Sequence, residues 1–328
     1  MIKKPLVTVI VIDYKKSNSY LTECLEAIGR QSYENFEVVL ESDHPLKLNY
    51  PKLKIVNYRG SYRSPAFKRD HAGQIARGEI LAFIDDDAAP EKDWLKNLVK
   101  NFTNQKVTGV CGPGITPPHV SWQEAASGWM SASPLGAGPY TYRFLPGKKQ
   151  FVDDYPSMNL AVRRTDFLAV GGYDSHYWPG EDTKLCLDLV TKLQKKIVYD
   201  PKVVVYHHRR PLWRGHLRQN GNFGLHRGFF ARILPQTSFR PVYLGPPFMV
   251  AGLIYLLLSP GIFPTLTLLG WILFVCYLLA VTVNSYWIYT RSQSLFQGVL
   301  SFFVVLITHL WYGLRFLQGF FFTTKLRR

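Results

Sequence analysis

Three consecutive aspartates, Asp85, Asp86 and Asp87, directly follow the apolar run at residues 80–84. Five apolar residues in a row are typical of a strand buried on both faces of a parallel sheet. Open α/β sheets bind ligands at the carboxyl ends of their strands, where these carboxylates stand. Adjacent carboxylates repel one another unless a cation lies among them, and hard divalent cations prefer oxygen ligands. The pattern therefore predicts a site for a metal-bound polyphosphate.

The elements that must position these acids alternate between strand and helix patterns. Apolar runs predict strands at 7–12, 36–40, 54–57 and 79–84, and helical spacing predicts helices at 19–31 and 64–77. This alternation predicts a Rossmann-like, mostly parallel sheet over residues 1–110. Asp43 ends the second of these strands, so parallel pairing would bring it next to the triplet.

The segment that follows has weaker signals. Strands are expected at 159–162 and 197–205, and a helix at 182–195. Residues 112–150 are rich in Gly and Pro and have few periodic signals, so we expect them to lack regular structure. A stretch this long without regular structure is usually functional or mobile.

Charge is distributed very unevenly along the 328 residues. All 23 Asp and Glu residues fall at or before Asp200, where 26 Lys and Arg leave a net charge of only +3. The remaining 128 residues hold 13 Lys and Arg and no acid. This asymmetry indicates two different solvents rather than one uniformly basic protein.

Three apolar stretches occupy the C-terminal part of the chain, at roughly 246–262, 265–287 and 297–322. A membrane span needs about 20 mostly apolar residues, so the second and third qualify and the first is marginal. The first is cut at Ser259-Pro260-Gly261. Core helices of a soluble domain are the alternative. The long absence of acids and the Trp and Tyr residues at the ends of the stretches favour a membrane.

The number of membrane crossings stays open. Three crossings would place Lys325, Arg327 and Arg328 outside the cytosol, against the positive-inside tendency. Either one stretch is re-entrant or interfacial, or the tail breaks the rule. Arg315 makes the last stretch a candidate for not crossing.

Residues 209–240 mix basic and aromatic side chains just before the first apolar stretch. Nucleic-acid binding is one interpretation of such mixing. Its position favours an interfacial amphipathic helix with Arg near anionic headgroups. The expected organisation is an α/β domain at 1–205 that contains the acid triplet, a basic interfacial segment at 206–243, and a membrane domain of two or three helices at 244–328.

The N-terminal sequence and the cysteines indicate the cellular compartment of the chain. The apolar run at 6–12 is too short and too β-branched for a signal peptide. Cys24, Cys111, Cys186 and Cys276 show neither metal spacing nor a disulfide framework. We therefore expect residues 1–240 to stay in the reducing cytosol at a membrane, with a bacterial plasma membrane as the expected case.

Several short motifs occur in a fixed order along the chain. They are residues 9–12, Gln31-Ser32-Tyr33, residues 36–39, Arg77-Gly78-Glu79-Ile80, the acid triplet, Gly171-Gly172-Tyr173-Asp174 and Gly180-Glu181-Asp182. Together they resemble family 2 glycosyltransferases of the GT-A fold. The tail, through Gln219, Phe223-Gly224 and residues 309–313, looks like that of membrane-attached members similar to succinoglycan-type glucosyltransferases.

The resemblance implies a metal-dependent site for a nucleotide-diphosphate sugar, expected to be a UDP-sugar, with Mn²⁺ or Mg²⁺. It assigns Asp87 to the metal and Asp85 to the ribose or base. Asp86 alternates with them and could face the opposite side. His207 is placed as a third metal ligand, with adjacent His208 as an equal alternative and a plain strand-end histidine as another.

Further donor contacts are implied for six residues. Asp43 resembles the acid that contacts uracil. Lys68 and Arg69 would face the phosphates or ribose, with a solvated helix face as the alternative. Gln219, His226 and Arg227 fall where membrane-embedded relatives place a motif over the donor diphosphate, although Gly228 replaces the usual aromatic residue.

The acceptor side rests on Gly180-Glu181-Asp182. The resemblance implies inverting transfer, with Asp182 as the base for an acceptor hydroxyl and Glu181 shaping the site. Acids at a helix start are also favoured by the helix dipole, and both interpretations are compatible. The expected acceptor is a lipid-linked saccharide at the cytosolic membrane face. The rival hypotheses are a polyprenyl-phosphate glycosyltransferase and a non-catalytic membrane subunit that binds nucleotide sugar or polysaccharide.

Overall fold

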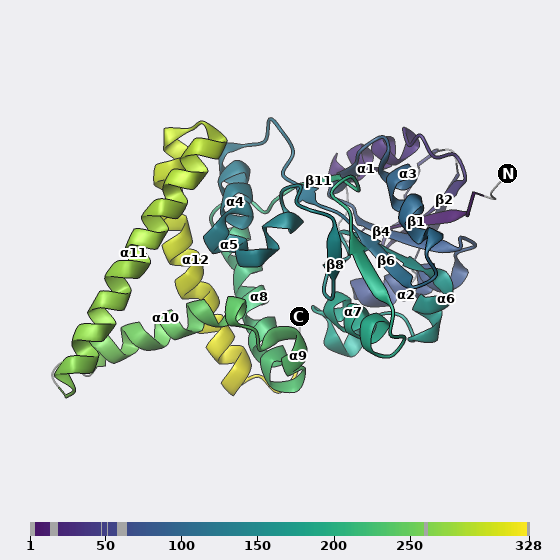
Figure 1. The fold of residues 1–328 in the computed structure, drawn as a ribbon. Helices are drawn as coiled ribbons and strands as arrows, with labels where there is room; N and C mark the ends of the chain where they lie inside the picture. The colour runs from purple at the N-terminus through teal and green to yellow at the C-terminus, as the bar shows by residue number, and fades with distance from the viewer. Residues whose placement is uncertain are drawn as a thin grey trace. The chain divides into compact units, whose positions relative to one another are not determined.

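The computed structural model describes residues 4–13, 19–46, 48–50, 52–57, 64–258 and 262–326 (Figure 1). Within these residues the chain forms two compact units. The first unit comprises residues up to 117 and 142–208, and the second comprises 118–141 and 209–326. The chain passes from the first unit to the second after residue 208. The assignment of 118–141 to the second unit has no counterpart in the sequence.

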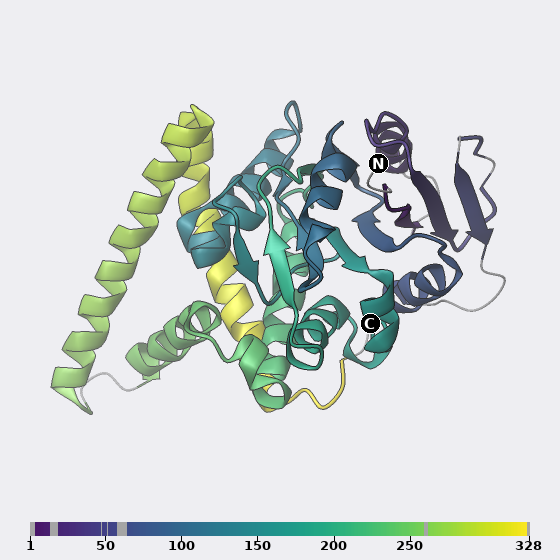
Figure 2. The same ribbon diagram turned by 45° about the vertical axis from the view of Figure 1, so that its right-hand side comes forward.

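The first unit is built on an eight-stranded sheet in the order β3-β2-β1-β4-β9-β6-β10-β8 (Figure 2). Its parallel half contains β1 (Val7–Asp13), β2 (Phe36–Ser42), β3 (Leu53–Asn57) and β4 (Ile80–Asp85). The other half contains β6 (Val107–Cys111), β8 (Gln150–Val152), β9 (Asn159–Arg163) and β10 (Lys196–Tyr199). Strand β9 runs antiparallel between β4 and β6. The predicted α/β fold with a mostly parallel sheet is confirmed.

Burial explains why these segments form central strands. All seven residues of β1 are buried, as are the five apolar residues of β4. A strand covered on both faces needs a continuous apolar run, which both sequences supply. Helix α1 (Ser19–Gly29) buries Leu21, Cys24, Leu25 and Ile28, the stripe that the sequence predicted.

Helix α2 (Pro65–Ile75) has clear start signals. Ser64 is its N-cap and accepts a hydrogen bond from the Phe67 amide, and Pro65 occupies the first turn. The remaining helices of the first unit are α3 (Trp94–Lys100), α6 (Arg164–Ala169) and α7 (Glu181–Thr191), with short helical turns η1 (Asn101–Thr103) and η3 (Ser175–Tyr177).

The single strand expected at 197–205 is wrong. The segment forms two strands, β10 and β11 (Val205–His207), which belong to different sheets. The Asp200 carboxylate accepts the Lys202 amide at 3.0 Å and its carbonyl accepts the Val203 amide at 3.0 Å. This Asx-type turn interrupts the apolar run. Strand β11 then pairs with β5 (Ala88–Pro90) and β7 (Gly114–Ile115) in a three-stranded sheet.

The expectation of irregular structure over 112–150 is also wrong. The segment contains β7 and the helices α4 (Trp122–Ala132) and α5 (Pro134–Ala137), followed by the turn η2 (Gly138–Arg143). Ser121 caps α4 by accepting the Glu124 amide at 3.2 Å. Ser121 and Glu124 have the spacing of a capping box, a start signal that the Gly and Pro content obscured.

The second unit is helical. Helix α8 (Arg214–Ile233) and α9 (Pro235–Ser238) precede three long apolar helices, α10 (Pro241–Leu258), α11 (Pro264–Ser292) and α12 (Leu295–Phe321). These three are long and apolar enough to cross a membrane, in the part of the chain that the structure describes. The expected interruption at 259–261 lies outside the described residues.

Candidate active site

The acid triplet stands at the carboxyl edge of the first unit's sheet. Asp85 is the last residue of β4, and Asp86 and Asp87 form the turn into β5. In the small sheet His207 pairs with Ala88, the residue after Asp87. The His207 imidazole Nε2 lies 3.0 Å from Oδ1 of Asp87, which is only 2% exposed. Chain segments that are far apart in sequence therefore meet at this turn.

Asp85, Asp87 and His207 form a group suited to a metal. One ligand atom from each lies within 4.8 Å of the others. Two carboxylate oxygens and an imidazole nitrogen fit Mn²⁺ well and are compatible with Mg²⁺. The structure thus brings the predicted ligands Asp87 and His207 together and adds Asp85, which the sequence assigned to the ribose or base. Asp86 is not part of this group.

The structure distinguishes between the two adjacent histidines. The His208 ring stacks on Tyr20 with centroids 4.0 Å apart, and its Nε2 lies 3.1 Å from Glu23. Its backbone amide donates to the Asp87 carbonyl at 3.0 Å. His207 is therefore the histidine whose side chain faces the candidate metal site.

Arg69 joins the triplet to the second pair of acids. Its guanidinium donates to Asp85 Oδ1 at 2.9 Å and to Glu181 Oε1 at 3.0 Å. Burial alone would lower the pKa of Arg69, but the nearby charges of Asp85, Glu181 and others raise it above its ordinary value, so it stays cationic. Burial, and secondarily the charge of Asp182, raises the pKa of Glu181.

Asp182 stands in the first turn of α7, where the helix dipole favours an acid. Its Oδ1 accepts the Thr183 amide at 2.8 Å, and its side chain is part-exposed. The Thr183 hydroxyl donates to Asp154 at 2.9 Å. Asp182 is therefore held at a rigid helix start but remains accessible, whereas Glu181 is buried.

Lys68 and Asp43, which the sequence predicts to contact the sugar donor, bind each other. Lys68 Nζ donates to Asp43 Oδ2 at 2.6 Å and to the Asp13 carbonyl at 2.9 Å, and its side chain is fully buried. The Ser42 hydroxyl donates to Asp13 Oδ2 at 2.7 Å. The solvated helix face considered for Lys68 and Arg69 is therefore wrong, since both side chains are buried against carboxylates.

Asp70 anchors the loop that contains Gly171, Gly172 and Tyr173. Its Oδ1 accepts the Tyr173 amide at 2.6 Å. Gly172 has φ +73°, and a Cβ there would lie 2.3 Å from the same oxygen. Glycine is thus required both by the backbone conformation and by this close approach. Burial raises the pKa of Asp70 to about 7.

Gln219, His226 and Arg227 lie on α8 in the second unit. Arg227 donates to Ser238 Oγ at 3.2 Å, and its guanidinium lies 4.5 Å from the ring centroid of Tyr243. His226 packs edge-on against Phe230. These contacts are all within the second unit, so a part in donor binding stays a prediction for these three residues.

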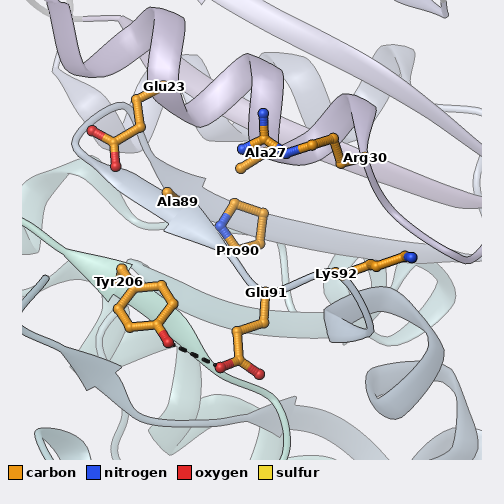
Figure 3. Close-up of a pocket in the computed structure, with 8 residues that line it drawn as sticks. All are labelled: Glu23, Ala27, Arg30, Ala89, Pro90, Glu91, Lys92 and Tyr206. Atoms are coloured by element: carbon orange, nitrogen blue, oxygen red, sulfur yellow. Dashed lines mark hydrogen bonds between the residues drawn. The ribbon is translucent and has the colours of Figure 1, made fainter. Parts of the chain in front are cut away.

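A separate shallow pocket of about 370 Å³ lies between α1, β5 and β11 (Figure 3). Glu23 and Arg30 line it from α1, Tyr206 lines it from β11, and Glu91 lines it from just after β5. The Tyr206 hydroxyl donates to Glu91 at 3.1 Å. None of the predicted site residues lines this pocket.

Two residues of the site edge were given no role from sequence. Asp13 is the last residue of β1 and accepts hydrogen bonds from the Ser42 hydroxyl and the Lys68 ammonium. Asp154, next to the start of α7, accepts a hydrogen bond from the Thr183 hydroxyl and pairs with Arg143. Asp13 carried a usable signal, because an acid at the end of a buried strand marks the ligand-binding edge. Asp154 lies in an irregular segment and carried none.

An α/β unit with acids grouped at the carboxyl edge of a mostly parallel sheet is the architecture of GT-A glycosyltransferases. The mannosyltransferase PcManGT of Pyrobaculum calidifontis, solved with GDP-mannose and Mn²⁺, has the same fold, with a TM-score of 0.58 and 18% identity over 98% of this chain and 88% of its own. Residues 8–167 match the model of the family described as Glycosyl transferase family 2. The chain is a family 2 glycosyltransferase.

Two curated relatives resemble the chain over much of its length. A glucosyl-dolichyl phosphate glucuronosyltransferase of Haloferax volcanii is 22% identical over 61% of this chain and 68% of its own. A second relative, from Methanococcus voltae, is also 22% identical, over 84% of this chain and 85% of its own. It is named as a glucuronosyltransferase that acts on dolichyl N-acetyl-α-D-glucosaminyl phosphate.

Proposed function

We propose that this enzyme transfers a sugar, with inversion, from a nucleoside-diphosphate sugar to a hydroxyl group of a lipid-linked saccharide. The observation that carries the proposal is the cluster of Asp85, Asp87 and His207, joined through Arg69 to the acids at the start of α7. The names of the two curated relatives support an acceptor sugar that is already attached to a lipid phosphate. A UDP-sugar is the donor that we expect.

Asp85, Asp87 and His207 would hold a divalent cation together with the donor. When bound, the ion would offset the charge that develops on the leaving diphosphate. Their oxygen and nitrogen donor set supports this role, and the Mn²⁺ bound by the solved mannosyltransferase is consistent with it. Asp86 belongs to the same turn and would shape it.

The nucleotide would lie against the edge formed by Asp43, Asp85 and the two basic residues of α2. Lys68 would hold Asp43 in position to contact the base of the nucleotide, because its ammonium is buried against that carboxylate. Arg69 would orient Asp85 and remain near the phosphates. The donor diphosphate would also be contacted by three residues of α8, namely Gln219, His226 and Arg227.

Asp182 would accept the proton of the attacking hydroxyl group. An accessible carboxylate at a rigid helix start meets the positional requirement of a general base. Glu181, buried and paired with Arg69, would keep the helix start in place rather than exchange the proton itself.

Membrane attachment would bring the lipid carrier to the site. The three long apolar helices of the second unit support an anchored enzyme, and we infer that the catalytic unit faces the cytosol. The second candidate is a polyprenyl-phosphate glycosyltransferase, which transfers the sugar to a lipid phosphate. Such an acceptor is already anionic and needs no general base. The relatives named for sugar-bearing lipids favour the first candidate. A binding-only subunit is not proposed, since the chain is an enzyme of this family.

The test is transfer of a labelled sugar from UDP-sugars and GDP-mannose to lipid acceptors in membranes, with product mass as the readout. Polyprenyl phosphate and the same lipid carrying one sugar are offered separately. We expect a product with two sugars on the lipid and no reaction with the bare phosphate. A product with one sugar on the bare lipid phosphate would replace the proposal with the second candidate.

A further inference from the structure

Helix α12 has an exposed apolar face and a buried face of mixed composition. Its exposed face carries apolar side chains at helical spacing, Val299, Phe303, Ile307, Leu310 and Leu314. Its buried face carries the polar side chains Gln297, Ser301 and Thr308 together with Val304, Val305 and Phe316. A helix surrounded by lipid would be apolar on both faces, so this pattern indicates protein on one side and apolar solvent on the other.

The polar side chains of the buried face bind two other helices of the second unit. Gln297 donates to the Trp122 carbonyl at 3.2 Å, at the start of α4. The buried imidazole of His216, on α8, links Ser127 Oγ at 2.7 Å to Thr308 Oγ1 at 2.9 Å. Burial lowers the pKa of His216 to about 4, so the ring is neutral. The polar groups of α12 are therefore used to attach α4 and α8.

Helices α8 and α12 run side by side in the same direction (Figure 1). A Cβ on Gly221 would meet the Trp311 indole at 2.2 Å, and one on Gly228 would meet the Phe316 carbonyl at 2.0 Å. Near the ends, Arg232 donates to the Phe320 carbonyl at 2.9 Å. Glycine thus allows backbone contact along residues 308–320 of α12.

Helix α8 is not a helix for the bilayer interior. Arg214, Arg218 and Arg232 are exposed on it, and Arg227 is half-buried. Its 20 residues span about 30 Å, equal to the whole hydrocarbon thickness. If α12 crossed the membrane, α8 would be drawn across with it. Each Arg at mid-bilayer would then cost about 3 kcal/mol or more.

The part of α12 outside this contact is too short to cross alone. Residues 295–307 rise about 20 Å, against a hydrocarbon core of about 30 Å. Helix α4 also packs against this part, through Gln297 and the cluster of Met130 with Val304 and Val305. By contrast, α11 is almost entirely exposed along its apolar length, and α10 is mostly so.

We propose that α10 and α11 are the only membrane crossings within the described residues, and that α12 lies in the plane of the bilayer surface. Its apolar face would enter the acyl chains of one leaflet, as in interfacial amphipathic helices. The residues after α12, including Lys325, would then lie on the same side as α8. This agrees with the positive-inside tendency that three crossings would violate.

Cysteine labelling from one side of the membrane tests the proposal in the full-length chain. Cys276 is exposed and is first replaced by alanine, whereas the other three cysteines are buried. Single cysteines are then introduced as Ile262→Cys, Gln293→Cys and Thr324→Cys, before α11, before α12 and after α12. With an impermeant maleimide on intact cells we expect labelling at 262 only, and labelling at 293 and 324 after permeabilisation. Any other pattern overturns the two-crossing arrangement.

A depth measurement tests the orientation of α12 without relying on the C-terminal label. Nitroxides at Phe303→Cys and Leu314→Cys occupy exposed positions 11 residues apart. An in-plane helix gives the same depth at both, within about 5 Å, one helical turn. A crossing helix gives depths that differ by about 16 Å. The larger difference would overturn the proposal, and neither readout depends on whether the proposed sugar transfer is correct.

Discussion

At the scale of single residues, Arg69 connects the two halves of the proposed chemistry. One guanidinium binds Asp85, at the nucleotide edge, and Glu181, next to the proposed base. Arg has a planar, permanently charged fork that can hold two carboxylates in fixed positions, which Lys cannot reproduce. The residues around it allow three tests.

The Asp87→Asn variant is expected to lose metal-dependent donor binding. Asn keeps the size of the side chain and removes the charge that would attract a divalent cation. The measurement is the change in melting temperature on adding Mn²⁺ and UDP-sugar. Asp86→Asn is the matched control from the same turn, and it should keep the shift. Equal shifts in both variants would contradict the assignment of Asp87.

The Asp182→Asn variant is expected to lose transfer while retaining donor binding. Removal of a general base costs about 10²- to 10⁴-fold in rate. Turnover is measured with saturating donor and lipid acceptor. Asp188→Asn is the control on the same helix, because that carboxylate pairs with Lys184 and Lys192 and faces no proposed chemistry. Full activity in Asp182→Asn would exclude the proposed base.

The Asp70→Asn variant is expected to remove a pH dependence of stability. The pKa of Asp70 is raised from 3.8 to about 7, so the folded protein loses stability as pH rises through this range. Asn still accepts the Tyr173 amide but does not ionise. Because the carboxyl is partly exposed, we expect an advantage of about 1–2 kcal/mol at pH 8 and little at pH 4.

Thermal unfolding at the two pH values measures this difference. Asp70→Ala is the control: it removes the acceptor for the Tyr173 amide and should destabilise at both pH values. An Asn variant whose advantage is the same at pH 4 and pH 8 would show that Asp70 does not titrate in this range.

At the scale of elements, the sequence predicted the strands and helices that have a periodic apolar pattern. It missed the turn whose position depends on tertiary contacts. The apolar runs of β1 and β4 and the stripe of α1 gave those elements within one or two residues. The run at 197–205 looked continuous because apolar residues flank its turn on both sides. The turn depends on hydrogen bonds made by Asp200, which composition does not reveal.

The same distinction applies to the candidate site. Asp85, Asp87 and Asp182 were found because acids at strand ends and helix starts stand out in a sequence. The choice between His207 and His208 depended on which one pairs opposite Ala88, a matter of register between distant segments. The ion pairs of Arg69 and Lys68 depended on burial in the folded unit.

The contact of α8 with α12 provides a test at this scale. Gly228→Ala places a methyl group against the Phe316 carbonyl, where backbone must move, and is expected to destabilise by about 1–3 kcal/mol. Gly252→Ala, on α10, is the matched control because nothing lies within 4 Å of its Cβ. Helix propensity alone should make that control neutral or slightly stabilising. Melting temperatures in detergent compare the two, and equal values would contradict the close packing.

At the scale of the whole molecule, charge is divided between the two units. Within the described residues, the second unit contains Glu124 as its single acid, and Glu124 accepts the Arg209 amide. Arg227 of this unit donates to the Ser238 hydroxyl and lies over the Tyr243 ring. A unit of this composition suits a bilayer with anionic headgroups.

Ligand binding by the intact protein provides the test at this scale. A nucleotide sugar at about 100 times its dissociation constant stabilises the folded state by about 2.7 kcal/mol. We expect this stabilisation with Mn²⁺ present and its loss with EDTA, for one class of nucleotide among UDP-sugars and GDP-mannose. Stabilisation that is unchanged by EDTA would contradict metal-dependent binding.

The pairing of β11 with β5 bears on how this enzyme can diverge. His207 is 120 positions from Asp87, yet its ladder partner is the very next residue, Ala88. The side chains proposed to hold the cation are brought together by this short ladder and not by the intervening chain. We expect that segments between them, including 118–141, can lengthen, shorten or be exchanged during evolution without displacing the proposed cation. Acceptor preference and metal chemistry are thereby left to diversify separately.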